Sequence, residues 1–138
     1  YVKEHNKNSI LRYWKSNTFI KGSFLKGWSP PHSSFFCKKK VYMEGKLYSE
    51  NLGTSSDIEL MYRFLEQYNF KSEYLNKVLV VMRYGGLSNN NFKNIYHQNV
   101  TTLKFLKIDN NFLKIIFFFI YKFFNRLKQF IKGRLFHD

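Results

Sequence analysis

The stretch from Ser55 to Leu65 constrains the fold most strongly, because it joins a helix start signal to an apolar stripe. Ser56 and Glu59 have the S-x-x-E spacing of a capping box. Apolar side chains then recur at steps of three and four residues, as on one face of a helix. This pattern predicts a helix over residues 57–68, with Ile58, Met61, Tyr62 and Leu65 on its buried face.

Asp57 falls in the first turn of that predicted helix. Unpaired backbone N–H groups and the positive end of the helix dipole favour an ionised carboxylate there. A carboxylate kept deprotonated at neutral pH is suited to act as a general base. The alternative is that Asp57 only caps the helix, as most acids in a first helical turn do.

The charge of the chain limits its partners. Among 138 residues, Lys and Arg number 23 against 9 Asp and Glu, and the formal net charge is +14. This excess favours phosphate-bearing partners, namely nucleic acid, anionic lipid headgroups or a nucleotide-linked substrate. Aromatic residues make up 20% of the chain, too many for a disordered basic tail. The single cysteine, Cys37, excludes an internal disulfide and is interpreted as a small buried hydrophobe rather than a nucleophile.

The remaining elements follow from local patterns. Pro30 and Pro31 require extended or turned backbone around them. Alternation, β-branched runs and glycine or asparagine breaks mark the others. We expect strands over 1–3, 33–38 and 77–83, irregular structure or short helices up to residue 27, a short helix or turn over 39–48, a loop over 51–54, and helices over 92–108 and 112–132, the last stopped by Gly133.

The last predicted helix, 112–132, is amphipathic and basic. The longest apolar run, Ile115 to Tyr121, is far shorter than the roughly 20 residues of a membrane-spanning helix, and no secretory signal is visible. The pattern indicates either a helix in an anionic membrane interface or one packed on the protein with a solvated lysine face. The apolar stripe is Ile116, Ile120, Phe123, Leu127 and Phe130, and the basic side is Lys107, Lys114, Lys122, Arg126 and Lys132.

Four segments occur in a recognisable order: Arg12–Lys15 (RYWK), Gly27–Phe36 (GWSPPHSSFF), Ser56–Leu65 (SDIELMYRFL) and Val80–Asn89 (VVMRYGGLSN). Together they resemble the family 2 glycosyltransferases of bacterial surface-polysaccharide synthesis. The resemblance implies an α/β fold, namely the C-terminal, acceptor-side half of a GT-A, Rossmann-like domain over residues 1–108. Residues 109–138 then form a basic amphipathic helical tail. In such open sheets the ligand binds near the carboxyl ends of the strands.

The resemblance also implies roles for individual residues. Asp57 matches the general base that takes the proton of an acceptor hydroxyl in an inverting transfer, whereas Glu59 matches a second acid that is interpreted as the capping partner. His32, held by two prolines, would orient the acceptor or only buttress its loop. Trp28 would stack on a sugar ring or anchor the core. Arg63 would pair with an acid or with phosphate, or be a surface charge. We expect these five residues to form the acceptor side of the site.

A glycine-rich turn follows the strand over 77–83. Arg83, Gly85, Gly86, Ser88 and Asn89 match an active-site loop whose backbone N–H groups contact phosphate, and a plain turn is the alternative. The resemblance further implies a nucleotide-sugar donor, a glycan or lipid-linked acceptor, and a divalent metal, Mg or Mn, with ligands mostly upstream of Tyr1 and none assigned in this chain. We therefore expect a fragment, inactive without its donor half, at the inner face of a bacterial plasma membrane.

The match departs from the family at the turn before the helix, where Lys46 replaces a glycine and Gly45 stands one place early. Two other functions compete with sugar transfer. The charge and the interleaved aromatics favour a nucleic-acid-binding module, although no signature motif of one is present. The last helix alone favours a non-catalytic piece that binds an anionic membrane through residues 112–132.

Overall fold

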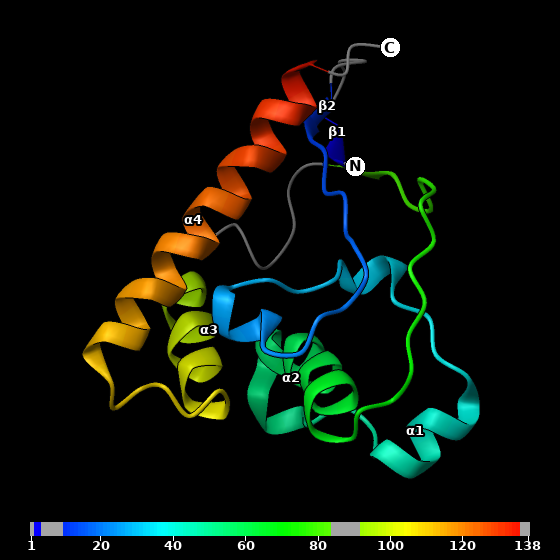
Figure 1. The fold of residues 1–138 in the computed structure, drawn as a ribbon, viewed down its shortest axis with the longest axis vertical. Helices are drawn as coiled ribbons and strands as arrows, with labels where there is room; N and C mark the ends of the chain where they lie inside the picture. The colour runs from blue at the N-terminus through cyan, green and yellow to red at the C-terminus, as the bar shows by residue number, and fades with distance from the viewer. Residues whose placement is uncertain (1, 4–9, 84–91, 136–138) are drawn as a thin grey trace.

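The computed structural model describes residues 2–3, 10–83 and 92–135, and helices dominate this part of the chain (Figure 1). Its helices are α1 (Lys39–Gly45), α2 (Ser56–Tyr62), α3 (Phe92–Phe105) and α4 (Phe112–Leu135), and its strands are β1 (Val2–Lys3), β2 (Ile10–Arg12) and β3 (Met82–Arg83). Short helical turns link them, namely η1 (Ser23–Lys26), η2 (His32–Ser34), η3 (Glu50–Ser55) and η4 (Arg63–Gln67).

The three strands form one small mixed sheet. β1 lies in the centre, antiparallel to β2 and parallel to β3, so that Val2 pairs with Arg12 on one side and Met82 on the other. The parallel pair joins segments about eighty residues apart in the sequence, and it brings the end of the 70–83 segment back to the start of the chain. The expected α/β fold is confirmed only as a mixture of helix and strand, because helices dominate the described residues and this small sheet does not show a Rossmann-like GT-A domain.

Most predicted helices are confirmed, and the predicted strands less so. α1, α2 continued by η4, and α3 lie where the sequence predicts helices. The strand predicted over 33–38 is wrong, because η2 occupies 32–34 and residues 35–38 have no pairing partner. Only residues 82–83 of the predicted 77–83 strand are paired, and the 51–54 loop is the helical turn η3. β2 lies in a segment for which the sequence predicts no strand.

The core lies where α2, α3, the start of α4 and η1 meet. Its buried side chains are Phe24, Met61, Leu65, Leu103, Leu106, Ile108 and Phe118. Trp28 packs edge-on against Phe24, with ring centroids 5.6 Å apart, and Tyr62 meets Phe24 in the same way. The predicted helix face is therefore confirmed, because Met61 and Leu65 are buried in this cluster and Ile58 and Tyr62 pack against it.

Helix α4 approaches the rest of the molecule closely at two glycines. A Cβ added to Gly27 would lie 2.7 Å from the Cβ of Lys122, and one added to Gly133 would lie 2.8 Å from the carbonyl oxygen of Leu11. Gly133 was expected to stop the helix, and that prediction is wrong, since α4 continues to Leu135. The glycine is needed instead for the close packing of α4 on β2.

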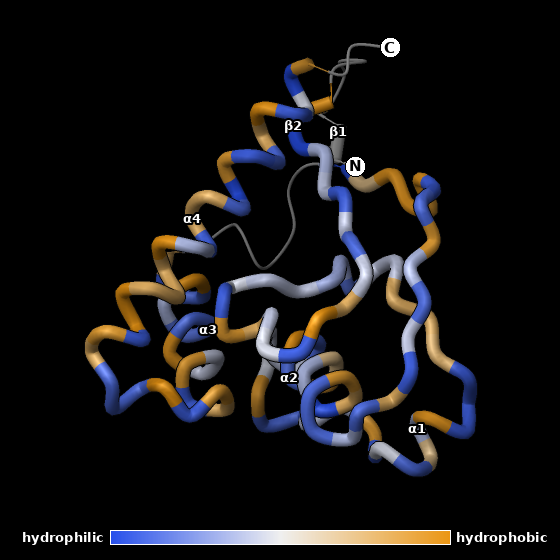
Figure 2. Tube along the Cα trace, viewed as in Figure 1, coloured by the Kyte–Doolittle hydropathy of each residue, from blue (hydrophilic) through white to orange (hydrophobic). Residues whose placement is uncertain are grey.

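The face of α4 that packs on the molecule is not its most apolar face. The inward positions are Ile115, Phe118, Lys122, Asn125, Gln129 and Gly133. The exposed positions include Leu113, Ile116, Phe117, Ile120, Phe123, Phe124, Leu127 and Ile131. Figure 2 shows how hydrophobic and hydrophilic positions alternate along α4. Lys122 departs from the expected solvated basic side, whereas Lys107, Lys114, Arg126 and Lys132 are exposed as expected. Most of the predicted apolar stripe is exposed as well, since only Phe130 is half-buried. Among the described residues, no helix is both long enough and apolar enough to cross a membrane.

Candidate functional site

Several predicted site residues meet at one broad, open cavity of about 1390 Å³. Its walls come from β2 and the chain after it, the segment 27–38, the start of α2, the segment 70–83 and the inward face of α4. Trp28, His32, Asp57 and Arg83 line it, whereas Glu59 and Arg63 do not. The volume exceeds that of a typical small-molecule cleft, so the cavity can hold a large or extended ligand.

The most direct contact in this cavity joins His32 and Asp57. Their Nδ1 and Oδ2 atoms lie 3.2 Å apart, and the side chains are 56% and 27% exposed, so both remain accessible from the cavity. The residues are 25 positions apart in the sequence, and the fold brings them together by packing η2 against α2. The pairing of His32 with Asp57 could not be read from either motif alone.

Local backbone geometry holds both partners in place. Pro31 is extended, and His32 begins the turn η2, which is closed by the Phe35 amide donating to the His32 carbonyl oxygen at 3.1 Å. Asp57 lies in the first turn of α2, and its Oδ1 accepts from the backbone N–H of Ile58 at 2.8 Å. One carboxylate oxygen of Asp57 thus serves the helix start, and the other faces His32.

Glu59 and Arg63 form a separate buried pair. Arg63 Nε donates to Glu59 Oε1 at 2.8 Å, and its two terminal nitrogens donate to the carbonyl oxygens of Gly45, Lys46 and Leu47 at the end of α1. The hydrogen bond to Glu59 raises the pKa of Arg63. This guanidinium, 10% exposed, joins α1 to α2 and is not placed to meet a substrate.

The predicted capping box is wrong. Ser55, not Ser56, occupies the N-cap position, and no side-chain hydrogen bond caps the helix there. Ser56 Oγ instead donates to the carbonyl oxygen of Gly53 at 2.8 Å. Glu59 turns away from the helix start, because both of its oxygens are engaged by Arg63, one turn later, and it also accepts from Ser49. Arg63, and not the backbone N–H groups at the helix start, therefore binds this carboxylate.

The turn at Gly45 and Lys46, at the end of α1, has a strained backbone. Lys46 has φ +64° and ψ 159°, a conformation that glycine adopts far more readily than lysine. The preceding Gly45 cannot take a larger side chain, because an added Cβ would clash with the ring of Phe64. The sequence comparison predicts an altered turn here, and the structure shows the alteration as a lysine, Lys46, in a backbone conformation suited to glycine.

The other predicted residues are less closely associated with the His32–Asp57 pair. Trp28 belongs mainly to the aromatic core, and its Nε1 donates to Asn17 Oδ1 at 2.6 Å. Arg83 is exposed on β3, at the edge of the cavity. The rest of the predicted glycine-rich loop, which is Gly85, Gly86, Ser88 and Asn89, lies outside the described residues.

Sequence reasoning missed three cationic residues of the cavity wall, Arg12, Lys122 and Arg126. Burial and the charge of Arg126 lower the pKa of Arg12 to about 10 and the pKa of Lys122 to about 8. The sequence did offer a reason to consider Arg12 a site residue, because Arg12 is the first residue of the RYWK segment. None existed for Lys122, because a lysine on an amphipathic helix is expected to face solvent.

Two chemistries find little support in the described residues. No three His, Cys, Asp or Glu side chains there gather closely enough to hold a metal ion. Asp57 and His32 alone do not make a ligand set for Mg or Mn, so no step is assigned to a metal in this chain. Cys37 is half-buried, and burial raises the pKa of its thiol, which makes it a poorer nucleophile.

Comparisons with known proteins identified no similar protein. The chain matches no protein-family model, no curated protein and no solved structure.

Proposed function

We propose that this chain is the acceptor-side part of an inverting glycosyltransferase, and that Asp57 is its general base. The observation that carries the proposal is the contact of 3.2 Å between His32 Nδ1 and Asp57 Oδ2 at the wall of a large cavity. Both residues come from segments that resemble family 2 enzymes, and they meet although neither segment predicts the other. The finer fold proposed is the C-terminal half of a GT-A domain, with a nucleotide-binding half supplied upstream.

The chemistry assigned to Asp57 is a proton transfer. As the acceptor oxygen forms its bond to the anomeric carbon, its proton passes to the Asp57 carboxylate. The bond between that carbon and the donor phosphate breaks on the opposite face, and its electron pair leaves with the nucleoside diphosphate. His32 Nδ1 lies 3.2 Å from Asp57 Oδ2, and we assign His32 the role of orienting this carboxylate, which makes it a positioning residue. Trp28 forms one wall of the cavity, where a sugar ring can lie against it.

The test uses the chain joined to its nucleotide-binding half, with a nucleotide sugar, a glycan or lipid-linked acceptor and Mg or Mn supplied. We expect Asp57→Asn to slow transfer by about 10²- to 10⁴-fold, the usual contribution of a general base, while donor binding stays unchanged. Asp109→Asn is the matched control, because Asp109 is exposed in the turn between α3 and α4. Transfer at the parental rate by Asp57→Asn would overturn the assignment. Tight, salt-sensitive binding of single-stranded DNA without any response to nucleotide sugars would favour a nucleic-acid-binding module instead.

We further propose that α4 holds the protein at an anionic membrane surface, on the cytoplasmic face of the plasma membrane. The support is the exposed apolar face of α4, on which Phe117, Ile120 and Phe124 are 57%, 44% and 52% exposed. Lys128 follows Phe124 by one turn and is exposed, so a positive charge borders that face. Apolar side chains beside exposed lysines suit the boundary between acyl chains and anionic headgroups.

Vesicle sedimentation tests the membrane proposal. We expect the chain to bind vesicles with an anionic lipid such as phosphatidylserine, and to bind neutral phosphatidylcholine vesicles at least tenfold more weakly. Replacing Phe117 and Phe124 by Gln should abolish binding. Phe92→Gln is the matched control, because Phe92 is 91% exposed at the start of α3 and lies outside α4. Dimerisation that disappears in the Phe117/Phe124 variant, with no vesicle binding by the parent, would assign this face to a second copy of the chain.

A further inference from the structure

The cavity has a cationic wall, which we define as Arg12, Lys122 and Arg126. Arg12 belongs to β2, and Lys122 lies on the inward side of α4. Arg126 follows Lys122 by one turn, at an exposed position that also lines the cavity. Arg12 Nε donates to Gln129 Oε1 at 2.6 Å, and Lys122 Nζ donates to Asn99 Oδ1 at 2.6 Å. Neutral amide oxygens therefore hold two of these cations in place.

Within the described residues, neither Arg12 nor Lys122 forms an ion pair with a carboxylate. Burial lowers the pKa of both side chains, and repulsion by the charge of Arg126 lowers each pKa further. A buried cation is costly unless an opposite charge compensates it, and a neutral hydrogen bond compensates only in part. In the part of the chain that the structure describes, Arg12 and Lys122 therefore lack a carboxylate whose negative charge would compensate theirs.

The rest of the cavity does not supply that charge. Among its described lining residues, the only acids are Asp57 and Glu73, whereas Lys and Arg side chains line it from several segments. Asp57 already faces His32. A pocket with such an excess of one sign concentrates ions of the opposite sign.

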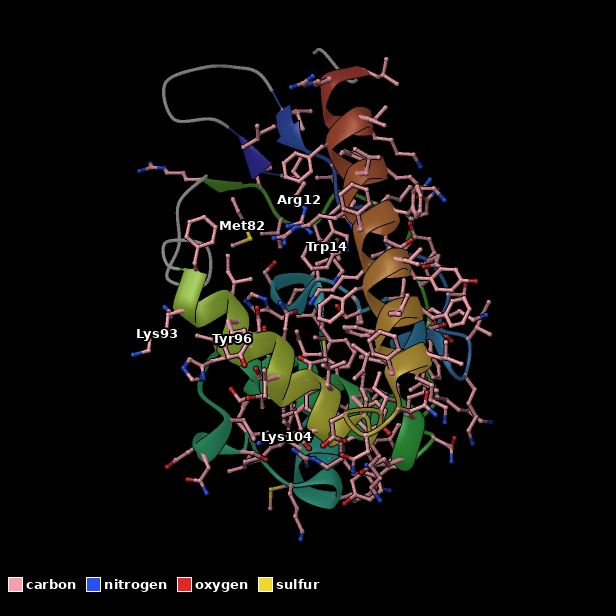
Figure 3. The ribbon with its side chains drawn as sticks, turned by 90° about the vertical axis from the view of Figure 1, so that its left-hand side faces the viewer. Arg12, Trp14, Met82, Lys93, Tyr96 and Lys104 are labelled. Carbon is pink, nitrogen blue, oxygen red and sulfur yellow. The ribbon has the colours of Figure 1, made fainter. Side chains whose placement is uncertain are left out.

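Aromatic contacts hold the arginine of the wall in a defined position. The guanidinium carbon of Arg12 lies 4.3 Å from the ring centroid of Trp14 and 5.9 Å from that of Phe130. The side chains of Arg12 and Trp14 can be found in Figure 3. Together with the bond to Gln129, these contacts fix the plane of the guanidinium. A planar fork held in place is suited to two parallel hydrogen bonds with a phosphate group.

We propose that the cationic wall binds a phosphate or diphosphate group of the substrate in the same cavity that presents Asp57 and His32. The inference rests on the proposed function, and it names the chemical class of the ligand on the α4 side. A diphosphate carries enough negative charge to neutralise the wall, which a neutral glycan cannot do. Two substrates of the proposed reaction carry this group, namely a nucleotide-linked donor and a lipid-linked acceptor.

The first experiment measures binding of inorganic pyrophosphate to the chain by calorimetry. We expect salt-sensitive binding that Arg12→Gln and Lys122→Gln each weaken at least tenfold. Lys104→Gln is the matched control for net charge, because Lys104 is exposed on α3 and lies outside the cavity, and its affinity should stay within twofold of the parent. Equal affinity for the parent, Arg12→Gln and Lys122→Gln would overturn the inference, as would an equal loss in Lys104→Gln.

A second measurement guards against a variant that misfolds. Pyrophosphate should raise the midpoint of thermal unfolding of the parent and of Lys104→Gln, and should raise that of Lys122→Gln much less. An equal rise in all three proteins would overturn the inference.

A competition experiment then distinguishes the nucleotide-linked donor from the lipid-linked acceptor as the ligand of the cationic wall. Displacement of pyrophosphate by uridine diphosphate but not by a short isoprenyl diphosphate assigns the wall to the donor. The reverse result assigns it to a lipid-linked acceptor.

The failure of this inference can be told apart from failure of the proposed function. If Asp57→Asn abolishes sugar transfer while Arg12→Gln and Lys122→Gln leave KM unchanged, the wall is not a phosphate site and the transferase assignment stands. If pyrophosphate binds with the expected dependence on Arg12 and Lys122 but Asp57→Asn transfers normally, the phosphate site stands and the base assignment fails.

Discussion

Replacing Lys122 by Met should stabilise the protein. Burial beside Arg126 lowers the pKa of Lys122 from 10.5 to about 8, so keeping this ammonium charged in the fold at neutral pH costs about 3 kcal/mol. Methionine has a similar length and no charge, and it removes this cost. It also removes the hydrogen bond of 2.6 Å to Asn99 Oδ1, a loss of about 1 kcal/mol. We therefore expect a net gain of about 2 kcal/mol at pH 7.

The dependence on pH provides a sharper test. Between pH 8 and 10.5 the unfolded chain still binds the Lys122 proton while the folded chain releases it, so the parent gains stability through this range. Lys122→Met lacks that gain. Its advantage over the parent should be full below pH 8 and fade as the pH rises toward 10.5. Urea unfolding followed by tryptophan fluorescence at pH 7 and pH 10 measures both effects.

Lys114→Met is the matched control, because Lys114 is exposed on the same helix, and its stability should stay within about 0.5 kcal/mol of the parent. A Lys122→Met protein that is no more stable than the parent at pH 7 would refute the reasoning. An advantage that does not change with pH would do so as well, because it would come from packing and not from the charge.

Three further substitutions test the local geometry. Lys46→Gly should stabilise the chain by about 1 kcal/mol and raise its thermal midpoint, because glycine adopts φ +64° without strain; a lower midpoint would contradict this. Gly133→Ala should destabilise it by about 2 kcal/mol in urea although Ala favours helices, because the new Cβ meets the Leu11 carbonyl oxygen; a gain would show that α4 can move away. Glu59→Gln should lower the free energy of unfolding by about 3 kcal/mol in the same assay, because it leaves the Arg63 charge buried without its carboxylate. A loss below about 1 kcal/mol would mean that the backbone carbonyl oxygens alone are enough to stabilise the buried guanidinium.

Most helices could be predicted from the sequence, because the patterns that indicate a helix lie within the helix itself. Met61 and Leu65 recur at helical spacing and are buried where that spacing places them. The strands were harder to predict, because a strand forms only where another strand pairs with it. The pairing of Val2 with Met82 joins distant parts of the chain, and no local pattern around either residue predicts the other.

The candidate site divides in the same way. Asp57 in a first helical turn could be predicted from its neighbours, whereas its contact with His32 depends on how η2 packs on α2. Glu59 was misassigned because a capping box is weaker than an ion pair with a buried arginine. The burial of Lys122 could not be predicted, since periodicity places it on the polar side of α4 and does not show which side faces the protein.

The rate of sugar transfer by Asp57→Asn tests the central claim most directly. Measured in a single turnover, with the nucleotide-binding half present and donor saturating, the proposed mechanism predicts a loss of about 10²- to 10⁴-fold against both the parent and Asp109→Asn. It also predicts an unchanged dissociation constant for the donor. A variant that transfers sugar at the parental rate would contradict the claim that Asp57 is the base.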